Sequence, residues 1–320
     1  MLKIEAAGPA YSPCGDRFIT EGYREGLDLE SQIERLARID GITGPPIMFP
    51  LEIDKDRLAN LLVKHGFQLG TVCPDTYCKP EWKFGTLASS DKAIREKAIR
   101  LCKDSMDFCA EMNGADILIW LAHDGYDYPF EDDYETRFGR IIDGLGEIAS
   151  HNANVRVTIE YKAKEPRTHQ YVSDAAKALL ICETVNAPNL GVVIDLGHSL
   201  QAGEEPAEAV SLVARYGRLF HIHLNDNFRT WDDDLLIGGV HFWETLEFFY
   251  WLQKYGYDGW YVIDIWPSRV NGEQSIIESV ERIRMFDSLA RSLPREQIVK
   301  LQEQNETMEI MRVIRESVFK

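Results

Sequence analysis

The stretch Val192-Val193-Ile194-Asp195-Leu196-Gly197-His198 is an apolar run that ends in an acid, with a histidine three residues further on. A short Val- and Ile-rich run of this kind is typical of a buried strand. Charged groups are rarely left unpaired where a strand leaves a core. The stretch therefore predicts either a local ion pair at a loop or a bound cation toward which both side chains point.

The rest of the chain repeats this pattern of a short strand followed by an amphipathic helix. Strands are predicted at residues 2–7, 46–49, 69–73, 115–121, 156–162, 190–196, 219–225 and 259–265. Helices are predicted at residues 29–40, 54–65, 90–113, 134–151, 172–184, 206–216, 240–255 and 275–293. Strict alternation without a glycine-rich phosphate turn after the first strand favours a (β/α)8 TIM barrel over a doubly wound sheet.

The barrel is expected to occupy residues 1–294, and residues 295–320 form a charged helical pattern beyond it. This C-terminal helical extension is either an arm that packs between subunits of a dimer or tetramer, or a solvated tail helix. We expect a homo-oligomer.

Composition restricts the function classes. The 35 Lys and Arg against 52 Asp and Glu leave a net charge of −17, which repels nucleic acid and anionic membranes. We expect neither as a partner. The N-terminal residues lack a basic segment followed by an apolar run, and no run of about 18 apolar residues occurs, so a cytoplasmic protein is expected. Six cysteines lack C-x-x-C spacing and are expected to be reduced thiols.

Ligand-type side chains gather at the ends of the last four predicted strands, where barrels of this class carry their functional groups. They are Glu160 and Lys162; Asp195 and His198; His221, His223 and Asp226, followed by Asp232, Asp233 and Asp234; and Asp264. Because side chains alternate along a strand, one residue from each strand, namely Glu160, Asp195, His223 and Asp264, can point into the barrel mouth at a matching depth.

Three converging carboxylates would repel one another without a cation, so these four residues predict a metal site. A single strand-end Asp is more often a helix cap, and a lone histidine is usually an ordinary polar residue. Four such residues on adjacent strands favour the metal. One imidazole with several carboxylates suits Mn²⁺, Co²⁺ or Mg²⁺ better than structural zinc, which prefers thiolates.

The combined motifs resemble the metal site of the xylose isomerase-like barrels. They are Glu160-x-Lys162-x-x-Glu165-Pro166, Asp195-x-x-His198, the His223 strand with Asp232-x-Asp234, and Asp264. A histidine at position 223, where xylose isomerase has an acid, makes the set more similar to L-rhamnose isomerase. Residues 82–87 (WKFGTL) and 120–122 (WLA) carry further similarity to that enzyme.

The resemblance implies a role for each matching residue. Glu160, Asp195, His223 and Asp264 would hold one divalent ion, most favourably Mn²⁺. His198, Asp232 and Asp234 would hold or position a second ion. Lys162 would contact a substrate oxygen, and Trp120 would form an apolar wall against the sugar carbons. The expected catalytic residues are Glu160, Lys162, His198 and Asp264.

One departure concerns the second strand, where those isomerases carry a histidine thought to assist ring opening. This chain has Met48 there, and Leu51 replaces a nearby tryptophan. A thioether cannot transfer a proton. His123, in the loop after the fourth strand, is the nearest candidate to substitute as a substrate-binding residue; the alternative is an ordinary exposed loop histidine.

The function expected from these features is a metal-dependent aldose–ketose isomerase acting on a small neutral or weakly charged sugar. A ketose 3-epimerase or a keto-sugar lyase of the same barrel class is an alternative, since both use related proton-abstraction chemistry. From a different class, a non-catalytic sugar-binding barrel subunit would bind metal without turning over sugar.

Overall fold

The computed structural model describes residues 2–165 and 167–319, so Pro166 of the quoted motif lies outside the described residues. Within these ranges, eight strands form one parallel sheet with neighbour order β1-β10-β9-β8-β6-β4-β3-β2. They are β1 (Lys3–Ala6), β2 (Ile47–Phe49), β3 (Thr71–Pro74), β4 (Asp116–Trp120), β6 (Arg156–Glu160), β8 (Leu190–Asp195), β9 (Leu219–Leu224) and β10 (Trp260–Ile263). A parallel bridge between Glu5 on β1 and Gly44 ahead of β2 brings the two ends of the sheet together. The predicted TIM barrel is confirmed.

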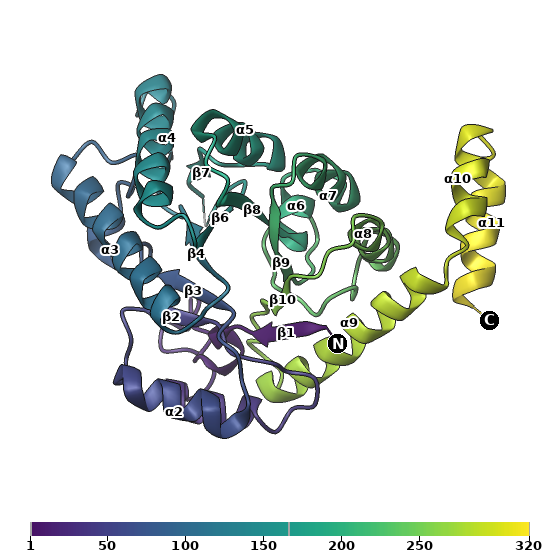
Figure 1. Cartoon of the computed structure of the whole chain (residues 1–320), viewed down its shortest axis with the longest axis horizontal. Helices are drawn as coiled ribbons and strands as arrows, with labels where there is room; N and C mark the ends of the chain where they lie inside the picture. Colours follow the sequence, from purple (N-terminus) through teal and green to yellow (C-terminus); the bar gives the residue numbers. More distant parts are fainter. Residues whose placement is uncertain (1, 166, 320) are drawn as a thin grey trace.

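Helices surround the strands, as Figure 1 shows. They are α1 (Leu29–Leu36), α2 (Lys55–His65), α3 (Lys92–Glu111), α4 (Tyr134–His151), α5 (Ala175–Val185), α7 (Pro206–Arg215), α8 (Phe242–Lys254) and α9 (Gly272–Ser292). Several begin at an aspartate whose carboxylate accepts a backbone N–H of the first turn; Asp54, Asp133 and Asp174 are examples. Such caps satisfy N–H groups that have no partner within the helix.

The core lies between strands and helices. Ile159, Ile194 and Ile222 alternate with the polar residues that face the barrel interior, and all three are fully buried. Burying an aliphatic side chain of this size contributes roughly 1.5–3 kcal/mol. The outward faces of the strands therefore hold the fold together and leave the inward faces free to carry polar groups at the mouth.

Some elements were not predicted. Helix α6 (Leu196–Gln201) begins directly after β8, and two short 3-10 helices lie at Gly8–Tyr11 (η1) and Pro80–Trp82 (η2). Strands β5 (Gly125–Tyr126) and β7 (His169–Gln170) pair antiparallel and join the loops that follow β4 and β6.

The predicted strand 156–162 also ends early, at Glu160. The N–H of Lys162 donates to the Val172 carbonyl instead of to a barrel strand. Lys162 therefore lies in the loop after β6 rather than on the strand.

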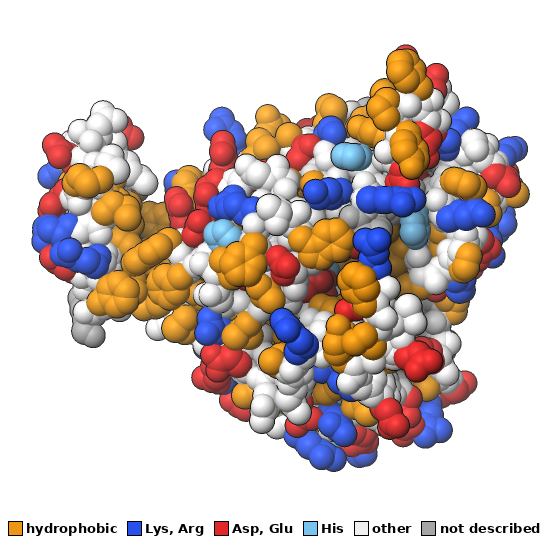
Figure 2. All heavy atoms as spheres, turned by 180° about the vertical axis from the view of Figure 1, so that it is seen from behind, with side chains coloured by type: hydrophobic (Ala, Val, Ile, Leu, Met, Phe, Trp, Pro, Cys, Tyr) orange, Lys and Arg blue, Asp and Glu red, His pale blue; other side chains and the backbone are white. Residues whose placement is uncertain are grey.

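Beyond α9, helices α10 (Arg295–Glu303) and α11 (Thr307–Val318) form a hairpin outside the ring of helices (Figure 1). Ile298 and Val313 are buried, whereas Met308 and Met311 are exposed. Figure 2 shows this arm standing apart from the barrel, with hydrophobic side chains along the hollow between them. In the part of the chain that the structure describes, no helix is both long and apolar enough to cross a membrane.

Candidate metal centre

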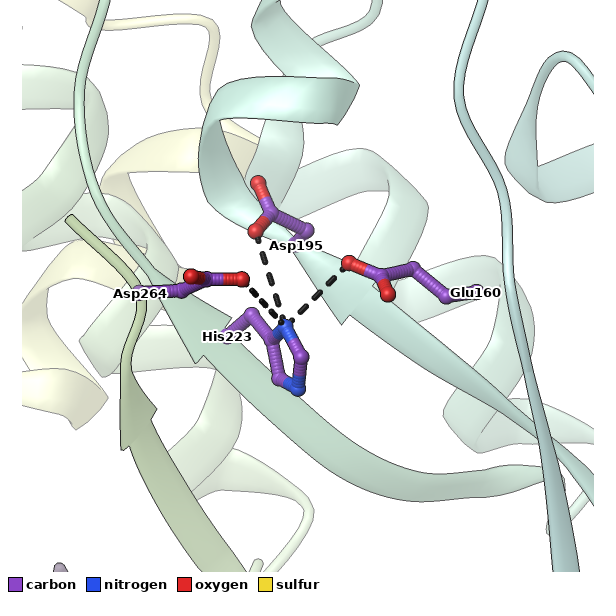
Figure 3. A group of neighbouring side chains, drawn as sticks. All are labelled: Glu160, Asp195, His223 and Asp264. Carbon is purple, nitrogen blue, oxygen red and sulfur yellow. Dashed lines mark ion pairs between the residues drawn. The ribbon is translucent and has the colours of Figure 1, made fainter. Parts of the chain in front are cut away.

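Four polar side chains meet at the carboxyl end of the barrel. Glu160 and Asp195 are the last residues of β6 and β8, His223 lies on β9, and Asp264 follows β10. One ligand atom from each lies within 4.8 Å of the others, and Figure 3 shows the three carboxylates directed at the His223 ring. Within residues 2–165 and 167–319, this is the one group of three or more such residues that could hold a metal ion.

The distances show that these four side chains do not satisfy one another's hydrogen-bonding atoms. His223 Nδ1 lies 3.2 Å from Glu160 Oε1, 3.2 Å from Asp264 Oδ2 and 3.9 Å from Asp195 Oδ2. Both Nδ1 and Glu160 Oε1 are buried and lack a hydrogen-bond partner with acceptable geometry. Buried polar atoms are normally paired. A divalent cation between the four side chains would give these atoms the partner that the protein does not provide.

Electrostatics support the same fit. Burial raises the pKa of Asp195 to about 6; the nearby His198 opposes this shift, while Asp232 and Glu160 add to it. Burial would also raise the pKa of Glu160, but the charges of His223 and His198 bring it down to about 2. Carboxylates this close together favour a cation among them, and one nitrogen with three carboxylates is a donor set suited to Mn²⁺, Co²⁺ or Mg²⁺.

Asp195 is held in place by its surroundings. It caps α6, because its Oδ1 accepts the backbone N–H of His198 at 2.8 Å. Its Oδ2 accepts from Asn225 Nδ2 at 2.9 Å, and the same amide nitrogen lies 3.4 Å from Asp234 Oδ1. Sequence reasoning missed Asn225. The only signal for it was its position immediately after the His223 strand.

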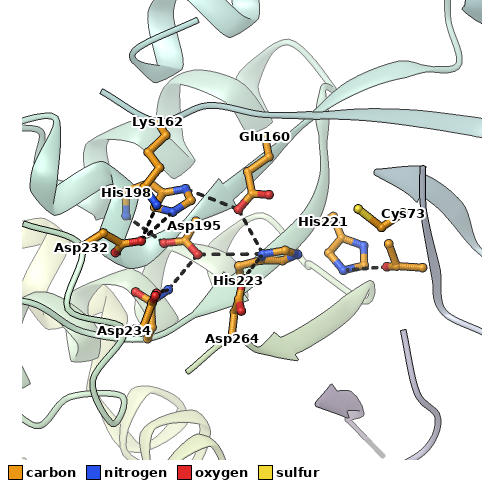
Figure 4. Close-up of polar contacts among 12 residues, drawn as sticks. Cys73, Glu160, Lys162, Asp195, His198, His221, His223, Asp232, Asp234 and Asp264 are labelled. Carbon is orange, nitrogen blue, oxygen red and sulfur yellow. Dashed lines mark hydrogen bonds and ion pairs between the residues drawn. The ribbon is translucent and has the colours of Figure 1, made fainter. Parts of the chain in front are cut away.

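A second cluster lies beside the first, built around Asp232 (Figure 4). Lys162 Nζ is 2.6 Å from Asp232 Oδ2 and 2.6 Å from Glu165 Oε2. His198 Nε2 is 3.2 Å from Asp232 Oδ2, and its Nδ1 donates to the Tyr161 carbonyl at 3.0 Å. The residues expected to hold a second ion thus share the mouth with the four ligands, but Asp232 already has two cationic partners.

The pKa directions within this second cluster follow from that pairing. Burial would raise the pKa of Asp232, but His198 and Lys162 hold it well below its usual value. Burial would lower the pKa of His198, yet Asp195 and Asp232 raise it to about 9. Asp234 differs, because burial and the nearby Asp232 and Asp264 raise its pKa well above its usual value. The surroundings of Asp234 therefore favour either its protonated form or a cation beside it.

The expected substrate residues lie on the neighbouring loops. The Lys162 ammonium lies over the Trp120 ring, 5.1 Å from its centroid. His123 Nε2 donates to the Tyr77 carbonyl at 3.0 Å. The His123 ring therefore holds the loop after β3 in place. In the WKFGTL segment, Trp82 is buried, and the buried Asp124 accepts the backbone N–H of Thr86 at 2.9 Å.

His221 points into the barrel below His223 and does not join the four ligands. Its Nδ1 lies 2.9 Å from Asp116 Oδ2, and its Nε2 lies 3.2 Å from Thr71 Oγ1 and 3.5 Å from Glu5 Oε1. All four residues of this barrel-core cluster are buried. Sequence reasoning placed His221 among the ligand-type residues but did not foresee its acidic partners, which lie on β1 and β4.

The fold and the site together define a parallel-barrel protein with a candidate metal centre at the carboxyl ends of its strands. Residues 25–286 match the family model described as xylose isomerase-like TIM barrel, and the chain belongs to that family.

Among curated proteins, the chain is 24% identical to the xylose isomerase of Thermus thermophilus over 226 residues, which cover 69% of this chain. The match spans 58% of that relative's length.

Solved structures share the fold. A D-tagatose 3-epimerase-like protein superposes with a TM-score of 0.72 at 17% identity, covering 91% of this chain and 98% of its own. L-ribulose 3-epimerase superposes with a TM-score of 0.71 at 17% identity, covering 93% of this chain and 98% of its own.

Proposed function

We propose that this protein is a divalent-metal-dependent aldose–ketose isomerase that acts on a neutral or weakly charged sugar, with Mn²⁺ as the favoured ion and Co²⁺ or Mg²⁺ as alternatives. The observation that carries the proposal is the four-donor group at the barrel mouth, with His198, Asp232 and Asp234 beside it. The name of the curated relative, a xylose isomerase, supports the same chemistry.

Glu160, Asp195, His223 and Asp264 would hold the resident ion, which supplies electrophilic polarisation of a substrate carbonyl when bound. Lys162, held between Asp232 and Glu165, presents its ammonium group to a substrate oxygen. Trp120 offers an apolar ring face to the sugar carbons. The buried Glu160 carboxylate can accept a proton from the carbon next to the carbonyl and return it to the carbonyl carbon, which converts aldose into ketose.

The isomerase is preferred because of Asp234. An epimerase that uses one ion has no need of a further group of donors beside the first. Here Asp234 lies against Asn225 and close enough to Asp232 and Asp264 for their charges to raise its pKa. A second cation held with His198 and Asp232 would relieve that repulsion.

A ketose 3-epimerase is the second candidate, and the ion pair between Lys162 and Asp232 favours it. With Lys162 at 2.6 Å, Asp232 is neutralised without a second ion, which suits a reaction that uses one metal. One structural relative is named a 3-epimerase and another a 3-epimerase-like protein. A keto-sugar lyase would use the same proton abstraction, and a non-catalytic subunit would bind metal alone.

The test is a Mn²⁺ titration of metal-stripped wild type and of His198→Asn, together with a panel of aldoses and ketoses in deuterated water. The isomerase predicts two ions in the wild type, one in the variant, and exchange at C2. The epimerase predicts one ion in both proteins and exchange at C3; loss of an orienting contact there costs about 10–100-fold in activity or affinity. Full activity in EDTA, from protein that carries no divalent metal, would contradict both enzymes.

A further inference from the structure

Tyr77 has no role in the sequence-derived site, yet its hydroxyl lies at the barrel mouth. It follows β3, and its Oη donates to Met48 Sδ at 3.3 Å and lies 3.6 Å from Cys73 Sγ. Met48 and Cys73 are paired across β2 and β3. The hydroxyl is therefore placed over the carboxyl ends of these two strands.

The Tyr77 hydroxyl lies beside Cys73, a side chain that strand alternation places on the interior face of β3. Thr71 points inward, since its Oγ1 meets His221 Nε2. Cys73, two residues further along β3, points to the same side one layer closer to the mouth. In Figure 4, Cys73 lies on the opposite side of His223 from Lys162 and Asp232.

The ring of strands places Tyr77 across the mouth from two of the metal-type ligands. Strand β3 is separated from β9, which carries His223, by β8, β6 and β4 on one side and by β10, β1 and β2 on the other. Strand β2 is likewise opposite β8, which carries Asp195. A sugar with its reacting carbons at the carboxylates would extend its other end toward β2 and β3.

The wall formed by Tyr77, Trp120 and Met48 has hydrogen-bonding groups that a ligand could satisfy. A thioether and a thiol are weak acceptors, so the Tyr77 hydroxyl has no strong acceptor in the contacts that the structure shows for it. Trp120 packs edge-on against Tyr77, with ring centroids 4.7 Å apart, and its buried Nε1 has no hydrogen-bond partner. A sugar oxygen is a much stronger acceptor than either sulfur.

The Tyr77 backbone is held in position. His123 donates to the Tyr77 carbonyl, and Thr76 Oγ1 donates to the Trp120 carbonyl at 3.4 Å. Burial raises the pKa of Tyr77 well above its usual value, so the hydroxyl keeps its proton and acts as a donor. A fixed donor at a mouth wall is preorganised for one oxygen position.

We propose that Tyr77 contacts the substrate and donates a hydrogen bond to a sugar hydroxyl oxygen remote from the reacting carbons. This inference rests on the proposed function, since it requires that a sugar occupies the mouth. It makes the wall of Tyr77, Trp120 and Met48 a determinant of which hydroxyl group the site accepts, without a part in the proton transfer itself.

The experiment measures sugar binding by calorimetry on Mn²⁺-loaded protein, which needs no turnover. Wild type, Tyr77→Phe and the control Tyr255→Phe are compared with the best-binding sugar and with its monodeoxy analogues at each hydroxyl. Tyr255, at the C-terminal end of α8, is partly exposed, and its hydroxyl lies 3.4 Å from Ser211 Oγ on α7, away from the mouth. Metal content and melting temperature are measured for all three proteins.

Tyr77→Phe should bind the parent sugar about 3–10-fold more weakly, as expected for one lost hydrogen bond, with unchanged metal content and melting temperature. For the analogue that lacks the contacted hydroxyl, wild type and Tyr77→Phe should bind equally. Equal affinity of both proteins for the parent sugar, or the same loss of affinity for every analogue, would contradict the role of Tyr77 without affecting the proposed function. A wild type that binds metal but none of the sugars would overturn the proposed function and this inference with it.

Discussion

Glu160 lies where one carboxylate could serve both metal binding and proton transfer. Its Oε1 faces both His223 and His198, at 3.2 and 3.3 Å, while the side chain is almost fully buried. A carboxylate in this position can bind an ion and also accept a proton from a substrate.

Glu160→Gln should lower turnover by about 10²–10⁴-fold, because the amide keeps the shape but loses the charge and the basicity. Asp264→Asn should behave similarly, with weaker metal affinity. The far-ultraviolet circular dichroism spectrum should stay unchanged in both. Glu147→Gln, which removes only an exposed ion pair with Lys103, is the control. Turnover close to that of wild type in Glu160→Gln would mean that the site is misplaced.

We expect His221 to make the stability of the fold depend on pH. Burial alone would lower its pKa, but Asp116 and Glu5 raise it to about 9. A cation whose folded pKa exceeds its ordinary value of about 6.5 stabilises the fold fully below that value, and this stabilisation is lost as pH rises through the folded pKa.

The free energy of unfolding, measured with urea from pH 6 to pH 10, should therefore fall more steeply for wild type than for His221→Gln above pH 7. The difference between the two proteins should be largest near pH 6 and shrink through about pH 9. Comparing the two proteins cancels the titration of groups that they share. A constant difference over this range would show that His221 is not a buried cation.

At the scale of single elements, α6 matters most, because Asp195 caps its N-terminus and its first turn carries His198. Gly197, inside that turn, is packed against the side chains of Asn225 and Asn227, and a Cβ there would overlap Asn225 Oδ1. Asn227 Nδ2 donates to the Gly197 carbonyl at 2.7 Å. The helix can approach the loop after β9 this closely only with glycine at this position.

Gly197→Ala should destabilise the protein by about 1–3 kcal/mol, as overpacking of a tight site generally does. It should also weaken metal binding, because Asn225 can no longer hold Asp195 Oδ2. Thermal melts and a Mn²⁺ titration measure the two effects. Gly139→Ala, in α4 with open space around the added methyl group, should not weaken metal binding. Unchanged metal affinity in Gly197→Ala would show that the contact between Asn225 and Asp195 does not support metal binding.

At the scale of the whole molecule, the C-terminal hairpin is the feature that a barrel does not require. Met308 is 76% exposed and Met311 50% exposed on α11, and an amphipathic helix that shows apolar residues to solvent is a candidate for packing against another chain. This supports the interpretation of residues 295–320 as an arm between subunits.

Sedimentation equilibrium should therefore show a dimer or tetramer for wild type. The double variant Met308→Glu, Met311→Glu should dissociate it while the helical content is retained, because buried glutamates would lose their hydration at the interface. Val63→Glu, at an 82% exposed apolar residue on α2, serves as the control and should leave the assembly unchanged. A monomeric wild type would make the hairpin a solvated tail.

Much of the architecture could be predicted from local pattern. The eight predicted strands each overlap one barrel strand, and α4 begins and ends as predicted, at Tyr134 and His151. Strand alternation also placed Glu160, Asp195, His223 and Asp264 together, because the direction of a side chain on a strand depends only on its position along that strand. Assignment of these residues to a metal is still a prediction.

Other features depended on the tertiary structure. The ion pair between Lys162 and Asp232, the acidic partners of His221 and the placement of the Tyr77 hydroxyl join residues from different loops or distant strands. Loop conformations are decided by packing against neighbours far away in sequence, so no periodicity in the chain predicts them. Local patterns in the chain were therefore enough to predict the barrel and the polar residues at its mouth, whereas the pairing of those residues depends on contacts that form only when distant segments pack together.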